Sequence, residues 1–81
     1  MLYRTKGTCA QAIQIEAEDG IIKSVQFIGG CSGNTAGISR LVAGMKVDDV
    51  IRLLEGTTCG TKPTSCPDQL ARALKELKAA Q

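Results

Sequence analysis

Apolar and polar residues alternate along residues 8–28. Ile13 and Ile15 are separated and followed by polar residues, and Val25 and Phe27 repeat the same pattern. Such alternation is typical of a β-strand with one buried face, because successive side chains point to opposite faces of a sheet. Two alternating runs close together in the chain therefore predict a β-hairpin.

The turn of this hairpin is predicted at Glu18-Asp19-Gly20, and its length determines which residues pair. A two-residue Asp-Gly loop would place Ile15 opposite Ser24, with the two apolar sets on opposite faces. A three-residue loop with a left-handed Gly20 places both sets on one face, and we choose this register. It pairs Ala17 with Ile21, Ile15 with Lys23, Ile13 with Val25, Gln11 with Phe27 and, by continuation, Cys9 with Gly29.

The other face of the hairpin is half apolar, since it carries Ala12, Ile22 and Ile28 among polar residues. Such a face could be solvated, or it could be used for self-association as a homodimer.

Three later segments repeat apolar residues at i, i+3, i+4 and i+7, the spacing of an amphipathic helix. Gly44 and Gly56 follow the first two helices and predict where they end. Residues 2–5 could add a short third strand. The sequence therefore predicts one α+β domain over residues 1–81, in which an N-terminal antiparallel hairpin packs against three helices. The apolar stripes are Ile38, Leu41, Val42 and Met45; Val47, Val50, Ile51 and Leu54; and Leu70, Ala73, Leu74 and Leu77.

Composition and charge narrow the class of protein. The chain of 81 residues is 43% hydrophobic and carries a net charge of +2, and Tyr3 and Phe27 are its only aromatic residues. This charge is too small, and the aromatic residues too few, to favour nucleic-acid binding. The N-terminus has no apolar core of signal-peptide length, and no stretch is apolar enough to span a membrane. A cytoplasmic location is therefore expected, where thiols are kept reduced.

Four cysteines carry the candidate chemistry, namely Cys9, Cys31, Cys59 and Cys66, and the chain has no histidine. No Cys-x-x-Cys pair is present, so their spacing alone is not a zinc-ribbon signature. Each cysteine nevertheless lies in a predicted loop or at the end of a predicted element, where ligands can converge. Four thiolates would suit tetrahedral zinc or an iron-sulfur cluster. The alternative is four unrelated thiols that only pack in the interior.

The segment from Thr57 to Asp68 runs from a loop into the start of the last helix. Pro67 presets a helical φ, and Asp68 places a negative charge in the first turn. Either Ser65 or Cys66 could be the capping residue. In both cases Cys66 lies at the helix start, a position that favours the thiolate form of a cysteine.

The run Thr64-Ser65-Cys66-Pro67-Asp68 resembles the motif that names the TSCPD domain family. The similarity covers nearly the whole chain, because Gly7-Thr8-Cys9, the run from Phe27 to Asn34, Cys59-Gly60 and the residues up to Leu70 also match. Members of this family occur as small stand-alone proteins and as C-terminal extensions of adenosylcobalamin-dependent ribonucleotide reductases. The resemblance thus implies a link to ribonucleotide reductase and deoxyribonucleotide synthesis. A chain of this length has no room for the reductase barrel, so we expect no reduction of ribonucleotides by the protein alone.

The order of elements is also similar, more distantly, to iron-sulfur scaffold proteins of the SufE/NifU-like fold. Three cysteines hold a nascent cluster in those proteins, and this similarity implies that Cys31, Cys59 and Cys66 correspond to them. The chain lacks the scaffold's histidine, and Cys9 could act as a fourth ligand.

Three functional hypotheses follow. In the first, the chain is a non-catalytic module that binds zinc or an iron-sulfur cluster through Cys9, Cys31, Cys59 and Cys66, as an accessory to a larger enzyme or to metal-centre assembly. In the second, Cys59 and Cys66 cycle between dithiol and disulfide and pass electrons to a reductase. A plain interaction domain is a third possibility.

Overall fold

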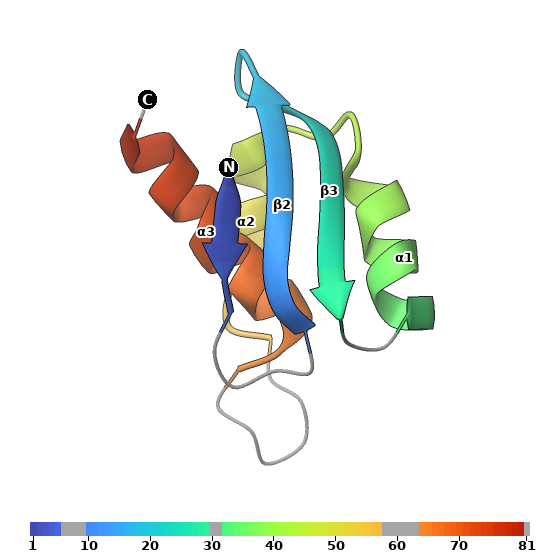
Figure 1. Ribbon diagram of the computed structural model, residues 1–81. Coiled ribbons are helices and arrows are strands. Elements are labelled where there is room, and N and C mark those ends of the chain that lie inside the picture. Colours follow the sequence, from blue (N-terminus) through green and yellow to red (C-terminus); the bar gives the residue numbers. More distant parts are fainter. Residues whose placement is uncertain (6–9, 30–31, 58–63, 81) are drawn as a thin grey trace.

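The computed structural model describes residues 1–5, 10–29, 32–57 and 64–80, which form one antiparallel sheet covered by helices (Figure 1). The sheet order is β1-β2-β3. The predicted α+β class is therefore confirmed, and the short third strand exists as β1. The elements are β1 (Leu2–Arg4), β2 (Ala10–Glu18), β3 (Ile21–Gly29), α1 (Ser32–Val42), α2 (Val47–Leu54) and α3 (Cys66–Ala80).

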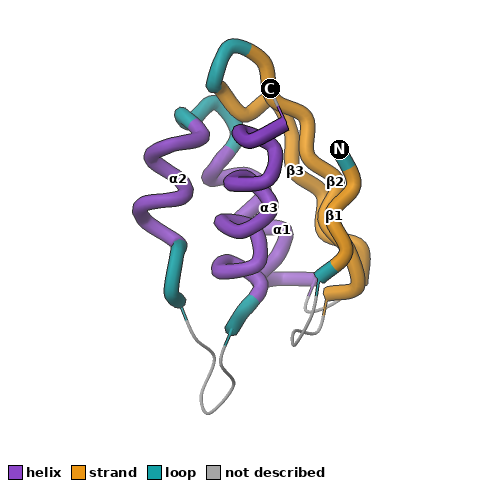
Figure 2. The backbone as a smooth tube through the Cα atoms, turned by 90° about the vertical axis from the view of Figure 1, so that its left-hand side faces the viewer, coloured by secondary structure: helices purple, strands orange, loops and turns teal. Residues whose placement is uncertain are grey.

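The three helices lie on the same face of the sheet (Figure 2). α1 packs along β3, while α3 contacts β2 on one side and packs along α2 on the other. α3 is thus the helix that joins the sheet to α2, and its apolar stripe is central to the core. The largest fully buried apolar side chains are Ile13, Ile15, Ile22, Val50, Leu70 and Leu74. Within the described ranges, no helix is long and apolar enough to cross a membrane.

The hairpin turn differs from the predicted one. Asp19 and Gly20 alone connect the two strands, with φ angles of 54° and 76°, as the two central residues of a type I′ turn require. Next to the turn, Ala17 pairs with Ile22 and Glu16 with Ser24, so Lys23 has no partner on β2 and forms a β-bulge. The predicted three-residue loop and its register are wrong.

The bulge gives a single apolar face despite the two-residue turn. Beyond it, Ile15 pairs with Val25 and Ile13 pairs with Phe27, so both apolar sets face the helices. It also turns Ile22, which was expected on the outer face, into the core, where its side chain is fully buried. The outer face is therefore less apolar than the sequence predicted.

A second irregularity lies at the far end of the hairpin, where Ala10 pairs with Gly29 and Ala12 with Ile28. The extra residue there is Gln11. The predicted pairing of Cys9 with Gly29 is wrong, since Gly29 pairs with Ala10; Cys9 itself lies outside the described residues.

The stripe of α3 is confirmed, since its four predicted residues are buried. The stripe of α2 is also confirmed: Val47 and Val50 are buried, and Ile51 and Leu54 pack against the core. Gly56, with a φ of 83°, follows the end of α2 as expected.

The first helix departs from its predicted stripe. α1 ends at Val42, before Gly44 with a φ of 88°, so Met45 packs against the core from outside the helix. Leu41 is 75% exposed. The buried face of α1 is centred on Thr35, Ile38 and Val42, and at about 100° per residue Leu41 lies roughly a quarter turn away from it.

Replacing Gly20 with alanine is expected to destabilise the protein by about 1 to 2 kcal/mol, because an L-residue at this φ is strained. Apart from Gly20 and its two chain neighbours, no described atom lies within 4 Å of a Cβ built there, so the backbone conformation causes the cost. Gly37, inside α1, has equally open surroundings and no positive φ. The control Gly37→Ala should therefore stabilise by roughly 0.5 to 1 kcal/mol. Urea unfolding measures both, and equal effects would contradict this account of the turn.

Candidate functional site

The start of α3 is held by Ser65, which is the capping residue. Its hydroxyl oxygen accepts a hydrogen bond from the Asp68 N–H at 3.2 Å and donates one to the Thr57 carbonyl at 2.6 Å. Its own carbonyl accepts the Gln69 N–H at 2.8 Å, the first bond of the helix ladder. Cys66 is thus the first helical residue, with a half-buried side chain. The choice that the sequence left open between Ser65 and Cys66 is settled in favour of Ser65.

Of the four predicted ligands, the structure describes Cys66. Cys9, Cys31 and Cys59 lie outside the described residues. Cys9 directly precedes β2, Cys31 directly precedes α1, and Cys59 follows α2 within five residues. The starts of β2, α1 and α3 and the ends of β3 and α2 all lie at one end of the molecule (Figures 1 and 2).

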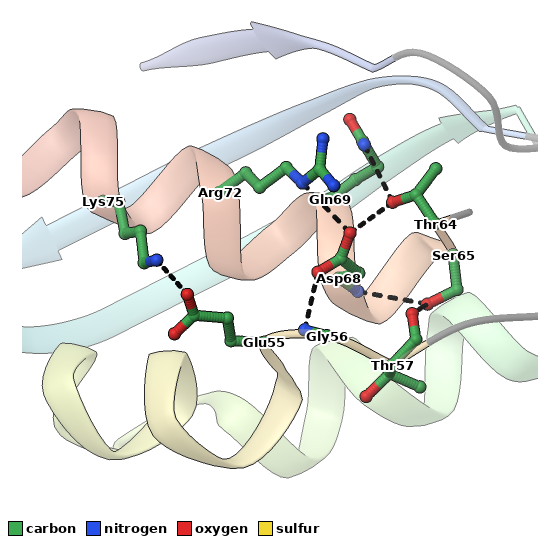
Figure 3. A network of polar contacts seen from close by, with 9 residues as sticks. All are labelled: Glu55, Gly56, Thr57, Thr64, Ser65, Asp68, Gln69, Arg72 and Lys75. Atoms are coloured by element: carbon green, nitrogen blue, oxygen red, sulfur yellow. Dashed lines mark hydrogen bonds and ion pairs between the residues drawn. The ribbon is translucent and has the colours of Figure 1, made fainter.

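Close to Cys66, the carboxylate of Asp68 is the centre of a polar network (Figure 3). Asp68 is only 3% exposed. Its Oδ1 accepts the Gly56 N–H at 2.8 Å, and its Oδ2 accepts a hydrogen bond from the Thr64 hydroxyl. The Arg72 Nε lies 3.0 Å from the same Oδ2, which completes an ion pair. Gln69 Nε2 donates to Thr64 Oγ1 at 3.0 Å and thereby holds the threonine hydroxyl in place.

These contacts determine the charge state of Asp68. Burial of the carboxyl acts to raise its pKa, because it removes the charged form from water. The hydrogen bonds from Thr64 and Gly56 and the charge of Arg72 favour the ionised form and outweigh burial. They hold the pKa of Asp68 below its ordinary value of 3.8, so the carboxylate is ionised at neutral pH.

The network joins two elements that are separated in sequence. Two of its hydrogen bonds, from Gly56 to Asp68 and from Ser65 to Thr57, run between the end of α2 and the start of α3. We call this set of contacts, made by Gly56, Thr57, Thr64, Ser65, Asp68 and Arg72, the α2–α3 clamp. Residues 58–63, which include Cys59, connect the two clamped ends.

The sequence pointed to Asp68 as a first-turn charge that complements the helix dipole and to Thr64 only as the first residue of a motif, and it did not point to Arg72. A usable signal was present in the spacing. Thr64, Asp68 and Arg72 follow one another at intervals of four residues. Within α3 this spacing places Asp68 and Arg72 one above the other, while Thr64 directly precedes the Ser65 cap.

Cys66 alone could not hold a metal ion. Among the residues that the structure describes, no three His, Cys, Asp or Glu side chains lie close enough together to bind a metal ion. A thiolate centre at Cys66 would therefore draw its other ligands from Cys9, Cys31 and Cys59.

The lowered pKa of Asp68 predicts how stability changes with pH. A carboxyl group whose pKa is lower in the folded than in the unfolded protein stabilises the fold above its unfolded pKa, and loses that contribution as pH falls through the folded pKa. Asp68→Asn should therefore cost about 1 to 3 kcal/mol at pH 7, with the difference from wild type shrinking below about pH 4.

Urea unfolding of the reduced, metal-free protein across this pH range measures the difference. Asp49→Asn is the matched control, because Asp49 forms an exposed ion pair with Arg52 at 3.5 Å. That change should cost less than about 1 kcal/mol at any pH. A constant deficit of Asp68→Asn down to acid pH would show that the carboxylate charge is not what stabilises the clamp.

The sequence was also compared with known proteins. The family described as the TSCPD domain matches residues 1–78. Neither the curated proteins nor the solved structures include a match to the chain.

Proposed function

The chain belongs to the TSCPD domain family, and we propose that it is a metal-binding module that holds zinc or an iron-sulfur cluster through the thiolates of Cys9, Cys31, Cys59 and Cys66. The observation that carries the proposal is the arrangement of the element ends next to these residues. The starts of β2, α1 and α3 and the ends of β3 and α2 gather at one end of the molecule, and each cysteine belongs to one of these element ends or lies within five residues of one in sequence.

The chemistry of the donor set supports the same proposal. Four thiolates without histidine suit tetrahedral zinc or an iron-sulfur cluster. Cys66 is the first residue of α3, so its position is fixed by the start of that helix. The half-buried position of this residue would also limit access of water to a bound metal.

The proposed role is accessory rather than catalytic. The chain has no histidine, which is the commonest general base, and the carboxylate nearest to Cys66 in sequence, Asp68, is fully engaged in the clamp. The module would support a larger enzyme, such as a ribonucleotide reductase, or the assembly of metal centres.

A second candidate, thiol redox exchange between Cys59 and Cys66, is favoured by one contact. The Ser65 hydroxyl donates a hydrogen bond to the Thr57 carbonyl at 2.6 Å. In sequence, Ser65 immediately precedes Cys66, and Thr57 lies two positions before Cys59. A disulfide requires Cα atoms roughly 4.4 to 6.8 Å apart, so a loop closed in this way would suit it.

Anaerobic purification followed by elemental analysis and an absorption spectrum distinguishes the two candidates. The metal-binding function predicts about one zinc ion or one cluster per chain, lost on replacement of any of the four cysteines by serine. If the purified protein contains no metal but has a thiol pair that oxidises readily and reversibly, the metal-binding function is wrong and the redox function is supported.

A further inference from the structure

We propose that Asp68 is a positioning residue for the cysteine site, and that the α2–α3 clamp holds Cys66 in place before any metal binds. This inference rests on the proposed function, because it concerns the same site. The inference adds to that site a carboxylate that is not itself a metal ligand. Asp68 acts by joining the end of α2 to the start of α3.

The contacts of Asp68 differ from those of an ordinary acidic residue in the first turn of a helix. Such a residue faces solvent or its own helix, whereas the Asp68 carboxylate accepts the N–H of Gly56, twelve residues earlier, at 2.8 Å. Its other oxygen is shared by Thr64 and by Arg72, which lies at 3.0 Å. Both oxygens are therefore occupied, and each contact fixes the orientation of the carboxylate.

Ser65 adds a second connection between the same segments. Its hydroxyl donates to the Thr57 carbonyl at 2.6 Å, next to the bond from Gly56 to Asp68. Two adjacent bonds restrain rotation as well as distance between the end of α2 and the start of α3. Cys66 lies between Ser65 and Asp68 in sequence, so both of its near neighbours in the helix start are fixed from outside the helix.

The energetics indicate why this position carries a charge. Burying a carboxylate destabilises a protein strongly unless the carboxylate is paired and hydrogen-bonded, and a well-packed apolar side chain at the same position would often stabilise the core more. The buried Asp68 gains instead a fixed geometry, because charge-assisted hydrogen bonds are short and directional. Groups that hydrogen-bond directly to metal ligands typically contribute a factor of about 10 to 100 in metal affinity, and this range is the upper bound for Asp68, which acts on Cys66 through the backbone.

The proposal is tested with Asp68→Asn, which keeps the size of the side chain but removes its charge. Asp49→Asn is the control, because it removes an exposed first-turn carboxylate from α2. Zinc affinity is measured by competition with a chromophoric chelator, at a temperature where circular dichroism shows each variant folded. We expect affinity lower by up to about 10- to 100-fold for Asp68→Asn, and unchanged for Asp49→Asn. Wild-type affinity in a folded Asp68→Asn protein would overturn the proposal.

Two further measurements separate positioning from a loss of folding or of ligands. The cobalt(II) spectrum should keep its thiolate charge-transfer intensity in Asp68→Asn, since the ligand set is unchanged. The Gly56 amide should be protected from hydrogen exchange in metal-free wild type and lose that protection in the variant. If Asp68→Asn does not fold, Arg72→Gln carries the test, because Arg72 is 54% exposed and its loss leaves no buried gap. It should weaken zinc binding in the same direction, and an unchanged affinity would overturn the proposal.

The outcome for a protein that takes no metal is also decisive. Wild type that takes up neither zinc nor, after anaerobic reconstitution, an iron-sulfur cluster would refute the proposed function. The position of Cys66 is then tested by its alkylation rate in a variant that retains Cys66 as its single cysteine. Asp68→Asn should change that rate several-fold relative to Asp49→Asn. An equal rate in the two variants would show that Asp68 does not position Cys66.

Discussion

Replacing Cys66 with serine is expected to abolish stable metal binding and to lower the melting temperature of the metal-loaded protein by roughly 15 to 30 °C. A serine hydroxyl is not deprotonated near neutral pH and is a poor ligand for zinc or iron-sulfur centres. Because the unfolded chain has no preformed site, binding free energy is also folding free energy. A ligand at about 1,000 times its dissociation constant adds about 4 kcal/mol, and each kcal/mol shifts the melting temperature of a small domain by about 4 to 8 °C.

The control for this change is Ala79→Ser, which introduces the same side chain at an exposed position of α3 and should leave metal content unchanged. Differential scanning calorimetry with and without a chelator measures the effect. The chelator should lower the melting temperature of wild type and of Ala79→Ser, and leave that of Cys66→Ser almost unmoved. If the Cys66→Ser protein has the melting temperature of wild type but no longer forms a disulfide, the result would contradict the metal function and support redox exchange.

The sequence predicted the elements of this fold better than their register. The four apolar residues of α3 repeat at helical spacing and are all buried, because α3 packs against both β2 and α2 and the whole stripe is covered by them. The hairpin register depended on a bulge at Lys23, and no residue type signals a bulge of this kind. Two alternating runs offset by one residue around an Asp-Gly turn are compatible with a longer loop or with a bulge. The structure adopts the bulge, because Asp19 and Gly20 both accept a positive φ.

The candidate site was predictable only in part, for a similar reason. Cysteines next to helix starts and turn residues can be located from the sequence alone, and Cys66 lies at the start of α3, as both possible cap assignments indicated. The clamp could not be predicted, because its central contact joins Asp68 to the backbone of Gly56, and a backbone N–H carries no sequence signature. Thr64 gave a weak signal through its spacing from Asp68. Its burial depended on how α2 and α3 pack.

Replacing Leu74 with alanine is expected to cost about 2 to 5 kcal/mol, the usual range for a fully buried leucine. Leu74 belongs to the stripe of α3, the helix that contacts both β2 and α2. The matched control is Leu41→Ala, because Leu41 is 75% exposed on α1 and should cost less than about 0.5 kcal/mol. Urea unfolding of the reduced, metal-free proteins measures both.

The same variant links the core to the proposed metal centre. A chain of 81 residues has a modest core and a total stability of roughly 5 to 10 kcal/mol, so metal-free Leu74→Ala should be marginally folded near 37 °C. Zinc held at the proposed centre would bind only the folded form, so its addition should restore the helical circular dichroism signal of Leu74→Ala through mass action. Cys66→Ser combined with Leu74→Ala should not respond to zinc. Recovery of the double variant by zinc would show that the ion stabilises the fold at a site other than Cys66, and would remove this residue from the proposed centre.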